Sequence, residues 1–273
     1  MASTEDLTVV VPTRDAAPLL PGCLDSVRRN GPGALVVVDG RSQDDSVGIA
    51  HEYGATVLSD DGLGLPAARL RGAEAAQTRY LALVDADVVL PDGSLAALLD
   101  ELVADRWDAL QAGLLSVSGP GYWGQALVHH HRTGRSRRWF GLVATVLERN
   151  TLLSLGFDDR FRSGEDIDLR WRMRAAGCRA GVSEHTTVIH RFAGDDLAFA
   201  HDQFLADGAG LGRMVRTRGA RGLRLVGLPA AAAARGMAMS LAEGEARWIP
   251  YYWEFARYNY RGMARALREA AGP

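Results

Sequence analysis

Asp85 and Asp87 are the residues of this sequence that most clearly indicate a chemical function. The two carboxylates stand one residue apart, directly after the apolar run 80–84. Carboxylates that emerge together from a buried strand into a loop can hold a hard divalent cation, and such a cation binds the oxygens of a nucleoside diphosphate. The alternative is an ordinary acidic turn, because Asp is common in turns. The interpretation therefore depends on the surrounding motifs.

Short apolar runs alternate with helix-like segments along the first half of the chain. The runs are rich in β-branched residues, as expected for central strands covered on both faces, and span 7–11, 34–38, 55–58 and 80–84. The helix-like segments span 19–29, 46–53, 66–76 and 94–104. This alternation predicts right-handed crossovers and an α/β fold with a mostly parallel sheet.

Polar segments follow three of these strands, at the point where each strand is expected to end. They are Pro12-Thr13-Arg14, Asp39-Gly40-Arg41-Ser42 and Asp85-Ala86-Asp87. In parallel α/β sheets, ligands bind beyond the carboxyl ends of the strands. The three loops are therefore expected to converge on one rim that binds a ligand.

Composition limits the protein's class. With 273 residues, the chain can form one sizeable α/β domain with a helical appendage, and its net charge of -2 gives no indication of nucleic-acid binding. Cys23 and Cys178 are far apart and lack metal or redox spacing, which suits reduced thiols. The first residues lack the pattern of a signal peptide, and no uninterrupted apolar run reaches about 18 residues. We therefore expect a cytoplasmic enzyme.

Five motifs together resemble family 2 glycosyltransferases of GT-A fold. In order, they are Val-Val-Val-Pro-Thr-Arg (9–14), Val-Asp-Gly-Arg-Ser-Gln-Asp-Asp-Ser (38–46), Gly-Leu-Pro-Ala-Ala-Arg (64–69), Val-Asp-Ala-Asp (84–87) and Gly-Glu-Asp-Ile-Asp-Leu (164–169). The match covers roughly residues 7–190. It implies a Rossmann-like, mostly parallel central sheet with flanking helices. Residues 1–198 are expected to form the nucleotide-sugar-binding and catalytic domain, and 199–273 a helical C-terminal extension.

The resemblance also implies an activity. It is inverting, metal-dependent transfer of a single sugar, of hexosyl type, from a nucleoside-diphosphate sugar to an acceptor hydroxyl. Asp87 would bind Mg²⁺ or Mn²⁺ directly, and Asp85 would hold the ribose or the water shell of the metal. His190 occupies the place of the family's C-terminal metal-binding histidine. A structural role for a lone His after an apolar strand is the alternative.

The other motifs imply contacts with the nucleotide. Pro12 and Thr13 would line the base and ribose pocket. Asp39 would accept a hydrogen bond from the base edge, since an ionised carboxylate is only an acceptor, or it bonds its own turn. Arg69 matches an Arg that neutralises the diphosphate or stacks near the base. Arg71 is a second candidate, and a solvated helix face is the alternative for both arginines.

The segment Gly164-Glu165-Asp166 opens a helix that is expected to run to Ala176. Acidic residues are common in a first helical turn because they complement the helix dipole, which also favours an ionised Asp166. By resemblance, Asp166 is the base that takes the proton from the acceptor hydroxyl, and Glu165 orients the acceptor.

Two other classes of protein remain open. A sugar-nucleotide nucleotidyltransferase of similar fold would need a Gly-rich phosphate loop after the first strand, and residues 11–15 do not form one. A non-catalytic nucleotide-sugar-binding protein would have no need of the acidic residues Asp85, Asp87 and Asp166.

The C-terminal third resembles no family that we can name. Five arginines precede the apolar stretch 225–241, at positions 213, 216, 218, 221 and 224. Aromatic residues follow it, among them Trp248, Tyr251, Tyr252, Phe255, Tyr258 and Tyr260. A basic cluster beside an apolar helix can lie on an anionic membrane surface, peripherally at its inner face, and present a lipid-linked acceptor. Alternatively the helices pack on the sheet or in a homodimer with the arginines solvated, and the acceptor is then a small molecule.

Overall fold

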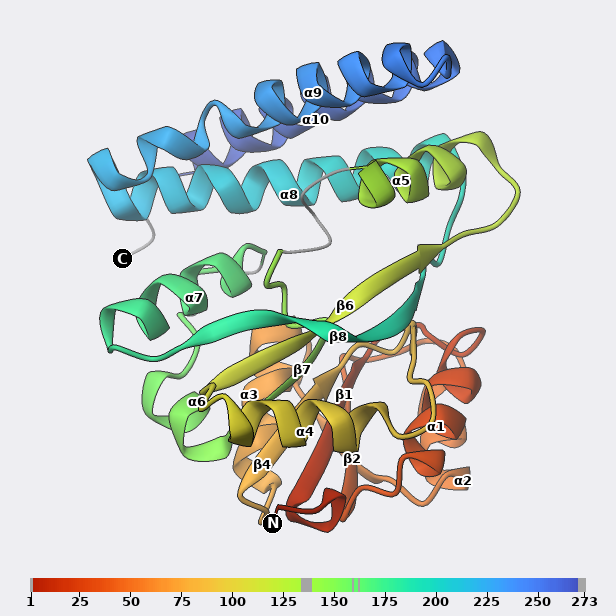
Figure 1. Ribbon diagram of the computed structural model, residues 1–273, viewed down its shortest axis with the longest axis vertical. Coiled ribbons are helices and arrows are strands. Elements are labelled where there is room, and N and C mark those ends of the chain that lie inside the picture. Colours follow the sequence, from red (N-terminus) through yellow and green to blue (C-terminus); the bar gives the residue numbers. More distant parts are fainter. Residues whose placement is uncertain (1, 134–138, 159, 162, 270–273) are drawn as a thin grey trace. The chain divides into compact units, whose positions relative to one another are not determined.

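The computed structural model describes residues 2–133, 139–158, 160–161 and 163–269 (Figure 1). The chain divides into two compact units. Unit 1 comprises 1–115, 138–159 and 169–191, and unit 2 comprises 116–137, 160–168 and 192–273. Unit 2 therefore combines the C-terminal helices with two earlier segments. The expected functional division at residues 198/199 stays a prediction.

The described residues form one eight-stranded sheet in the order β3-β2-β1-β4-β7-β6-β8-β5. The strands are β1 (Leu7–Thr13), β2 (Ala34–Asp39), β3 (Thr56–Ser59), β4 (Tyr80–Val84), β5 (Val88–Val89), β6 (Ala109–Val117), β7 (Ala144–Glu148) and β8 (Ala180–Arg191). The pairs β3–β2, β2–β1 and β1–β4 are parallel. The pairs β4–β7, β6–β7 and β5–β8 are antiparallel. The predicted α/β fold class is confirmed, and the sheet is mixed where a mostly parallel one was expected: β4 pairs in parallel with β1 and antiparallel with β7.

Helices cover both faces of the sheet in unit 1. Successive residues of β1 point to opposite faces, so they pack against different helices. Val9 and Val11 belong to one apolar cluster with Leu24 of α1 (Leu20–Arg29), whereas Val10 belongs to a second cluster with Ala73 of α3 (Leu65–Ala75). Helix α3 can approach closely since it carries Gly72, where any Cβ would clash with the side chain of Val10. The helices are η1 (Thr4–Asp6), α1 (Leu20–Arg29), α2 (Ser46–Glu52), α3 (Leu65–Ala75), α4 (Ser94–Ala104), α6 (Arg149–Leu155) and α7 (Glu165–Ala175), whose first turn belongs to unit 2.

Long helices dominate unit 2. They are α5 (Tyr122–Thr133), α8 (Leu197–Arg218), α9 (Leu228–Ala242) and α10 (Ile249–Arg268), with short 3₁₀ turns η3 (Gly219–Arg221), η4 (Leu223–Leu225) and η5 (Ala246–Trp248). Helices α9 and α10 lie together on one side of α8 (Figure 1). Gly208 and Gly212 of α8 allow this contact, because a Cβ at either would meet the backbone of α10.

Aromatic side chains form the core of unit 2. Tyr251 and Tyr252 of α10 are fully buried and pack with Phe204 of α8 and Ala126 of α5. His130 of α5 lies in the same cluster, where burial lowers its pKa to about 4. Much of the aromatic run after residue 248 therefore supplies a protein core.

Three of the five clustered arginines bind within unit 2 and are not solvated as a group. Arg213 donates to Oγ of Ser163 at 2.9 Å and lies 3.7 Å from a carboxylate oxygen of Glu269. Arg216 donates to the backbone carbonyls of Ala266 and Glu269. Arg218 forms an ion pair with the buried carboxylate of Asp168.

Candidate active site

The loops after β1 and β2 are tied to each other by hydrogen bonds between backbone and side chains. The amide of Asp15 donates to Oγ of Ser42 at 2.9 Å, and the amide of Gln43 donates to Oδ1 of Asp15 at 2.7 Å. The amide of Ala16 donates to Oγ of Ser46 at 2.9 Å. Two of the three predicted rim loops are therefore held as one structure.

Pro12, Thr13 and Asp39 lie where these loops begin. Thr13 and Asp39 are partners in the parallel register of β1 and β2, and all three residues are buried. The Asp39 carboxylate accepts from the amides of Arg41 at 3.0 Å and Ser42 at 3.2 Å. Asp39 thus stabilises its own turn, and its contact with a base stays a prediction.

Asp60 is a loop residue that belongs to none of the five sequence motifs. It is almost fully buried after β3, and its carboxylate accepts from the amides of Gly62 at 2.7 Å and Gly64 at 2.8 Å. These bonds fix the segment that leads into α3, the helix that carries Arg69. The turn sequence Asp60-Asp61-Gly62 after a strand was the available signal.

Arg69 is buried and holds Asp85. Only 1% of Arg69 is exposed, and its Nη2 lies 2.8 Å from Oδ1 of Asp85. The same nitrogen donates to the carbonyl of Leu142 at 3.5 Å. Burial raises the pKa of the Asp85 carboxyl, the guanidinium of Arg69 opposes this shift, and the nearby charge of Asp87 adds to it.

Arg71 lies outside this arrangement. Its side chain is 38% exposed, and its guanidinium binds the carbonyl of Ser59 and, at 2.7 Å, the carboxylate of Asp61. Arg71 therefore lies on a solvated face of the helix, which was the alternative to a nucleotide contact, whereas Arg69 does not.

Asp87 and His190 are brought together by the pairing of β5 with β8. His190 lies opposite Val88, and its Nε2 is 3.2 Å from Oδ2 of Asp87. The amide of Arg191 donates to the carbonyl of Asp87 at 3.0 Å and fixes the same turn. Burial alone would lower the pKa of His190, but the hydrogen bond and charge of Asp87 outweigh it, so the pKa is raised.

The residues present fit a divalent cation that is completed by a substrate. Oδ1 of Asp87 is buried and has no hydrogen-bond partner among the described residues. Over the same described part of the chain, no group of three His, Cys, Asp or Glu side chains is arranged to hold a metal. Mg²⁺ is often bound by one or two carboxylates together with substrate phosphates and water, so the lack of such a group does not conflict with the metal-binding role predicted for Asp87 and His190.

In unit 2, Glu165 and Asp166 occupy the first turn of α7. Glu165 is buried and Asp166 is half-buried. Gly164 precedes them with φ of +79°, and a Cβ there would lie 3.0 Å from Cα of Gly210 in α8. The hydroxyl of Ser163 donates to the carbonyl of Ala206 at 3.0 Å. This turn is therefore fixed on α8 by close backbone contact.

Asp207 of α8 is a second residue that the sequence did not point out. Its side chain is exposed, yet the surrounding protein reduces its hydration, and this desolvation together with the charge of Asp166 raises the pKa of Asp207 to about 7. Asp207 follows Ala206, which binds Ser163, so the packing of α7 on α8 brings the two carboxyl groups near each other. No short motif in the sequence connects positions 166 and 207.

A sequence model of the family "Glycosyl transferase family 2" matches residues 8–158. The chain belongs to this family. This glycosyl transferase family 2 protein is 33% identical over 181 residues to an uncharacterized glycosyltransferase of Mycobacterium bovis, a match that covers 63% of this chain and 81% of the relative. It is 31% identical over 209 residues to the pre-mycofactocin glycosyltransferase of Mycobacterium tuberculosis, which covers 69% of this chain. The chain spans 43% of that relative's length.

Among solved structures, the family 2 protein is similar to a mannosyltransferase of Pyrobaculum calidifontis in complex with GDP-Man and Mn²⁺. The TM-score is 0.66 at 19% identity, and the match covers 97% of this chain and 88% of the other. The similarity confirms the predicted GT-A fold.

Proposed function

We propose that the protein is a metal-dependent, inverting glycosyltransferase that moves one sugar from a nucleoside-diphosphate sugar to an acceptor hydroxyl. One observation carries the proposal most directly. At the end of β4, Arg69 holds Asp85 while Asp87, beside His190, keeps a buried oxygen that binds no other described group. A buried carboxylate oxygen without a partner is costly unless a ligand satisfies it.

The donor nucleotide would bind the rim loops of unit 1. Pro12 and Thr13 supply the wall of a base and ribose pocket at the end of β1, with Asp39 as the acceptor for a base N–H. The mutual hydrogen bonds of the two loops support this role, since a rigid pocket loses little conformational freedom when the nucleotide binds.

Asp87 and His190 would hold Mg²⁺ or Mn²⁺, and Asp85 would bind the ribose or a water of the cation. When bound, the cation offsets the negative charge that grows on the leaving nucleoside diphosphate. Arg69 fixes the orientation of Asp85 in this arrangement, as an ion pair in a buried position. The GDP-Man and Mn²⁺ in the similar mannosyltransferase support the class of donor and cation.

Asp166 would accept the proton of the acceptor hydroxyl. The acceptor oxygen forms a bond to the anomeric carbon, the bond from that carbon to the diphosphate oxygen breaks, and the nucleoside diphosphate leaves with the electron pair. A single displacement from the opposite side inverts the anomeric centre. Glu165, fixed in the same helical turn, would orient the acceptor.

Nucleotide binding tests the donor site directly. Thermal unfolding would be followed with UDP, GDP, dTDP and CMP, each with Mn²⁺ or with a chelator. A ligand at about 100 times its Kd stabilises the folded state by about 2.7 kcal/mol. We expect one nucleoside diphosphate to raise the Tm with Mn²⁺ and much less with chelator. Asp87→Asn should lose the Mn²⁺-dependent part of the shift.

Asp100→Asn is the matched control, because Asp100 is an exposed carboxylate on α4. It should retain the full shift. Equal shifts for Asp87→Asn and wild type, or shifts unaffected by the chelator, would exclude the metal assignment. Incubation with the donor distinguishes the classes of protein. Release of nucleoside diphosphate supports transfer, whereas formation of nucleoside triphosphate when pyrophosphate is added indicates a nucleotidyltransferase. No turnover with any acceptor indicates a binding protein.

A further inference from the structure

Helix α9 exposes an apolar surface. The segment Leu223–Ala242 is long and apolar enough, by length and composition, to cross a membrane, and only 28% of an apolar 18-residue stretch within it is buried. Its buried residues lie on one side of the helix, at Pro229, Ala233, Gly236 and Ser240. Large apolar side chains are exposed at both ends of α9 and on neighbouring α10: Leu223, Val226, Leu228, Leu241 and Trp253.

Helix α10 carries a basic stripe next to this surface. Arg257, Arg261, Arg265 and Arg268 recur every three or four residues and are exposed. The residues of α10 that contact α8, such as Asn259 and Met263, lie on the opposite side of the helix. The stripe therefore points away from α8.

The two helices run antiparallel, so the charged and apolar groups lie side by side. The hydroxyl of Tyr260 donates to the carbonyl of Val226 at 3.0 Å, and Gly236 packs against the ring of Tyr252. The basic end of α10 thus lies beside the apolar turn that begins α9. Figure 1 shows both helices on the same side of α8.

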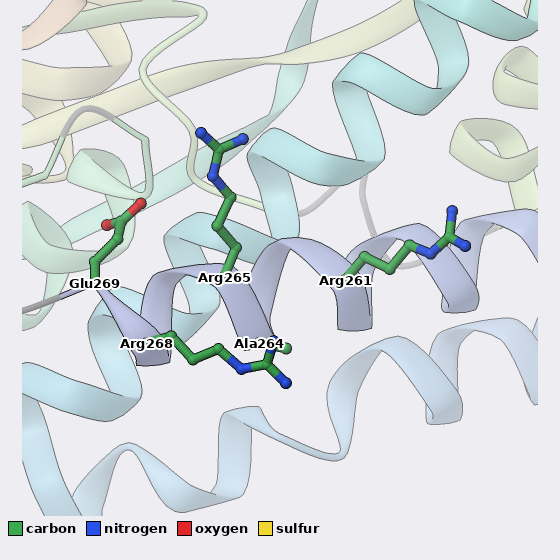
Figure 2. Close-up of a pocket in the computed structure, with 5 residues that line it drawn as sticks. All are labelled: Arg261, Ala264, Arg265, Arg268 and Glu269. Atoms are coloured by element: carbon green, nitrogen blue, oxygen red, sulfur yellow. The ribbon is translucent and has the colours of Figure 1, made fainter.

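The arginines at the end of α10 lack a neutralising partner within the part of the chain that the structure describes. Among the described residues, no carboxylate lies within ion-pair distance of Arg261, Arg265 or Arg268, and Glu269 beside them lies 3.7 Å from Arg213. With Ala264, these four residues line an open hollow of about 530 Å³. Figure 2 shows the three arginine side chains extending from successive turns of the helix.

We propose that this outer face of α9 and α10 docks on an anionic lipid bilayer. The guanidinium groups bind lipid phosphates, which supply the missing negative charge, and the exposed Leu and Trp side chains enter the boundary between headgroups and acyl chains. Phosphate oxygens are a good match for arginine donors. The proposal concerns attachment alone and does not depend on the proposed transfer activity.

The dimensions favour a helix that lies on the membrane over one that spans it. Helix α9 has 15 residues and is therefore about 22 Å long, whereas a bilayer core is about 30 Å thick. Gly227 separates it from the turn η4, and its buried side packs on the aromatic core of unit 2. Large apolar side chains at both ends suit a helix parallel to the surface.

Co-sedimentation tests the proposal. The full chain would be mixed with phosphatidylcholine vesicles with and without phosphatidylserine, at low and high salt. We expect binding that requires phosphatidylserine and falls as salt screens the charges. Since each arginine near an anionic surface contributes roughly 1 kcal/mol, the variant Arg261→Gln/Arg265→Gln/Arg268→Gln should bind on the order of 100-fold more weakly.

A matched triple variant controls for net charge. Arg28→Gln/Arg106→Gln/Arg174→Gln removes three exposed arginines from unit 1 and should bind much like wild type. Leu223→Gln/Leu241→Gln should weaken binding at low and high salt alike. Thermal unfolding and far-ultraviolet circular dichroism of each variant confirm that it folds.

Three outcomes overturn the proposal. They are no sedimentation with phosphatidylserine vesicles at low salt, equal losses in the two arginine variants, and a solution dimer that dissociates in Leu223→Gln/Leu241→Gln. The last would show that a second copy of the chain covers this face. Because no nucleotide is present in these measurements, a failure here is distinct from a failure of the proposed catalytic site.

Discussion

Arg69 of α3 and Asp85, which follows β4, form an ion pair of 2.8 Å in the interior of unit 1. The pair connects the helix that follows the β3 loop with the acidic loop after β4. Leu142 contributes its carbonyl to the same guanidinium and has a positive φ of 61°, an uncommon conformation for this residue. Arg69 thus links the acidic loop after β4 to the backbone at Leu142, and this link needs no bound ligand.

Removing one partner of this pair should destabilise the protein strongly. Arg69→Ala leaves the Asp85 carboxylate partly buried without its cation, for which losses of about 3–5 kcal/mol are typical. The free energy of unfolding from urea titration measures the effect. Arg69→Ala/Asp85→Ala should recover part of the loss.

The pair between Arg71 and Asp61 is a natural control. Nη2 of Arg71 lies 2.7 Å from Oδ2 of Asp61, but both side chains are exposed to solvent. Arg71→Ala should therefore lower the free energy of unfolding by less than about 1 kcal/mol. Equal losses for Arg69→Ala and Arg71→Ala would contradict the structural role assigned to Arg69.

The sequence was sufficient for the parallel half of the sheet. Buried strands such as 80–84 are short, β-branched and bounded by turn residues, and the structure places that strand at Tyr80–Val84 as predicted. The helix 94–104 was also placed correctly, because its apolar periodicity is strong. The antiparallel strands β6 and β7 were not delimited in advance, since their pairing depends on contacts between distant segments.

The candidate site was predicted unevenly. Each loop motif is local, so Asp85 and Asp87 could be placed at a strand end from the sequence alone. The burial of Arg69 and the function of Asp60 in its loop depend on how α3 packs, which no spacing rule encodes. The same is true of the arginines near residue 213, where three of the five bind to groups of unit 2 that lie elsewhere in the chain.

Asp166→Asn should separate catalysis from binding. Without a base, the acceptor hydroxyl keeps its proton, and turnover should fall by about 10²–10⁴. Nucleotide affinity, measured by calorimetry with Mn²⁺, should change little, because the substitution preserves the shape of the side chain. Asp202→Asn, an exposed position on α8, is the control and should retain activity. A parallel loss of affinity and rate in Asp166→Asn would remove Asp166 from the role of base.

Gly208→Ala tests the packing of α8 on α10. The new methyl group would collide with the backbone carbonyl of Asn259, and overpacking of this kind costs about 1–3 kcal/mol. Gly227→Ala is the matched control, since no atom lies within 4 Å of its added Cβ. Thermal unfolding should show a lower Tm for Gly208→Ala only. An unchanged Tm would mean that the two helices are packed less closely than the structure shows.

Asp207 should make the stability of the protein depend on pH near neutrality. Its pKa of about 7 lies above the value of about 3.9 expected in an unfolded chain, so the folded state binds the proton more tightly. Stability should therefore fall as the pH rises from about 4 to about 7, where the proton is lost next to the charge of Asp166, and level off above that range.

The variant Asp207→Asn cannot ionise and should lack this contribution. Its free energy of unfolding relative to wild type should increase with pH across the same range, because only wild type then carries the second negative charge. Among the described residues, Tyr251 of α10 and Asp166 of α7 interact electrostatically with Asp207, and neither is altered. Asp202→Asn, on the same helix, should follow the wild-type curve. Parallel curves for wild type and Asp207→Asn between pH 5 and pH 8, a range of roughly three units around the shifted pKa, would show that Asp207 is ionised throughout and does not sense Asp166.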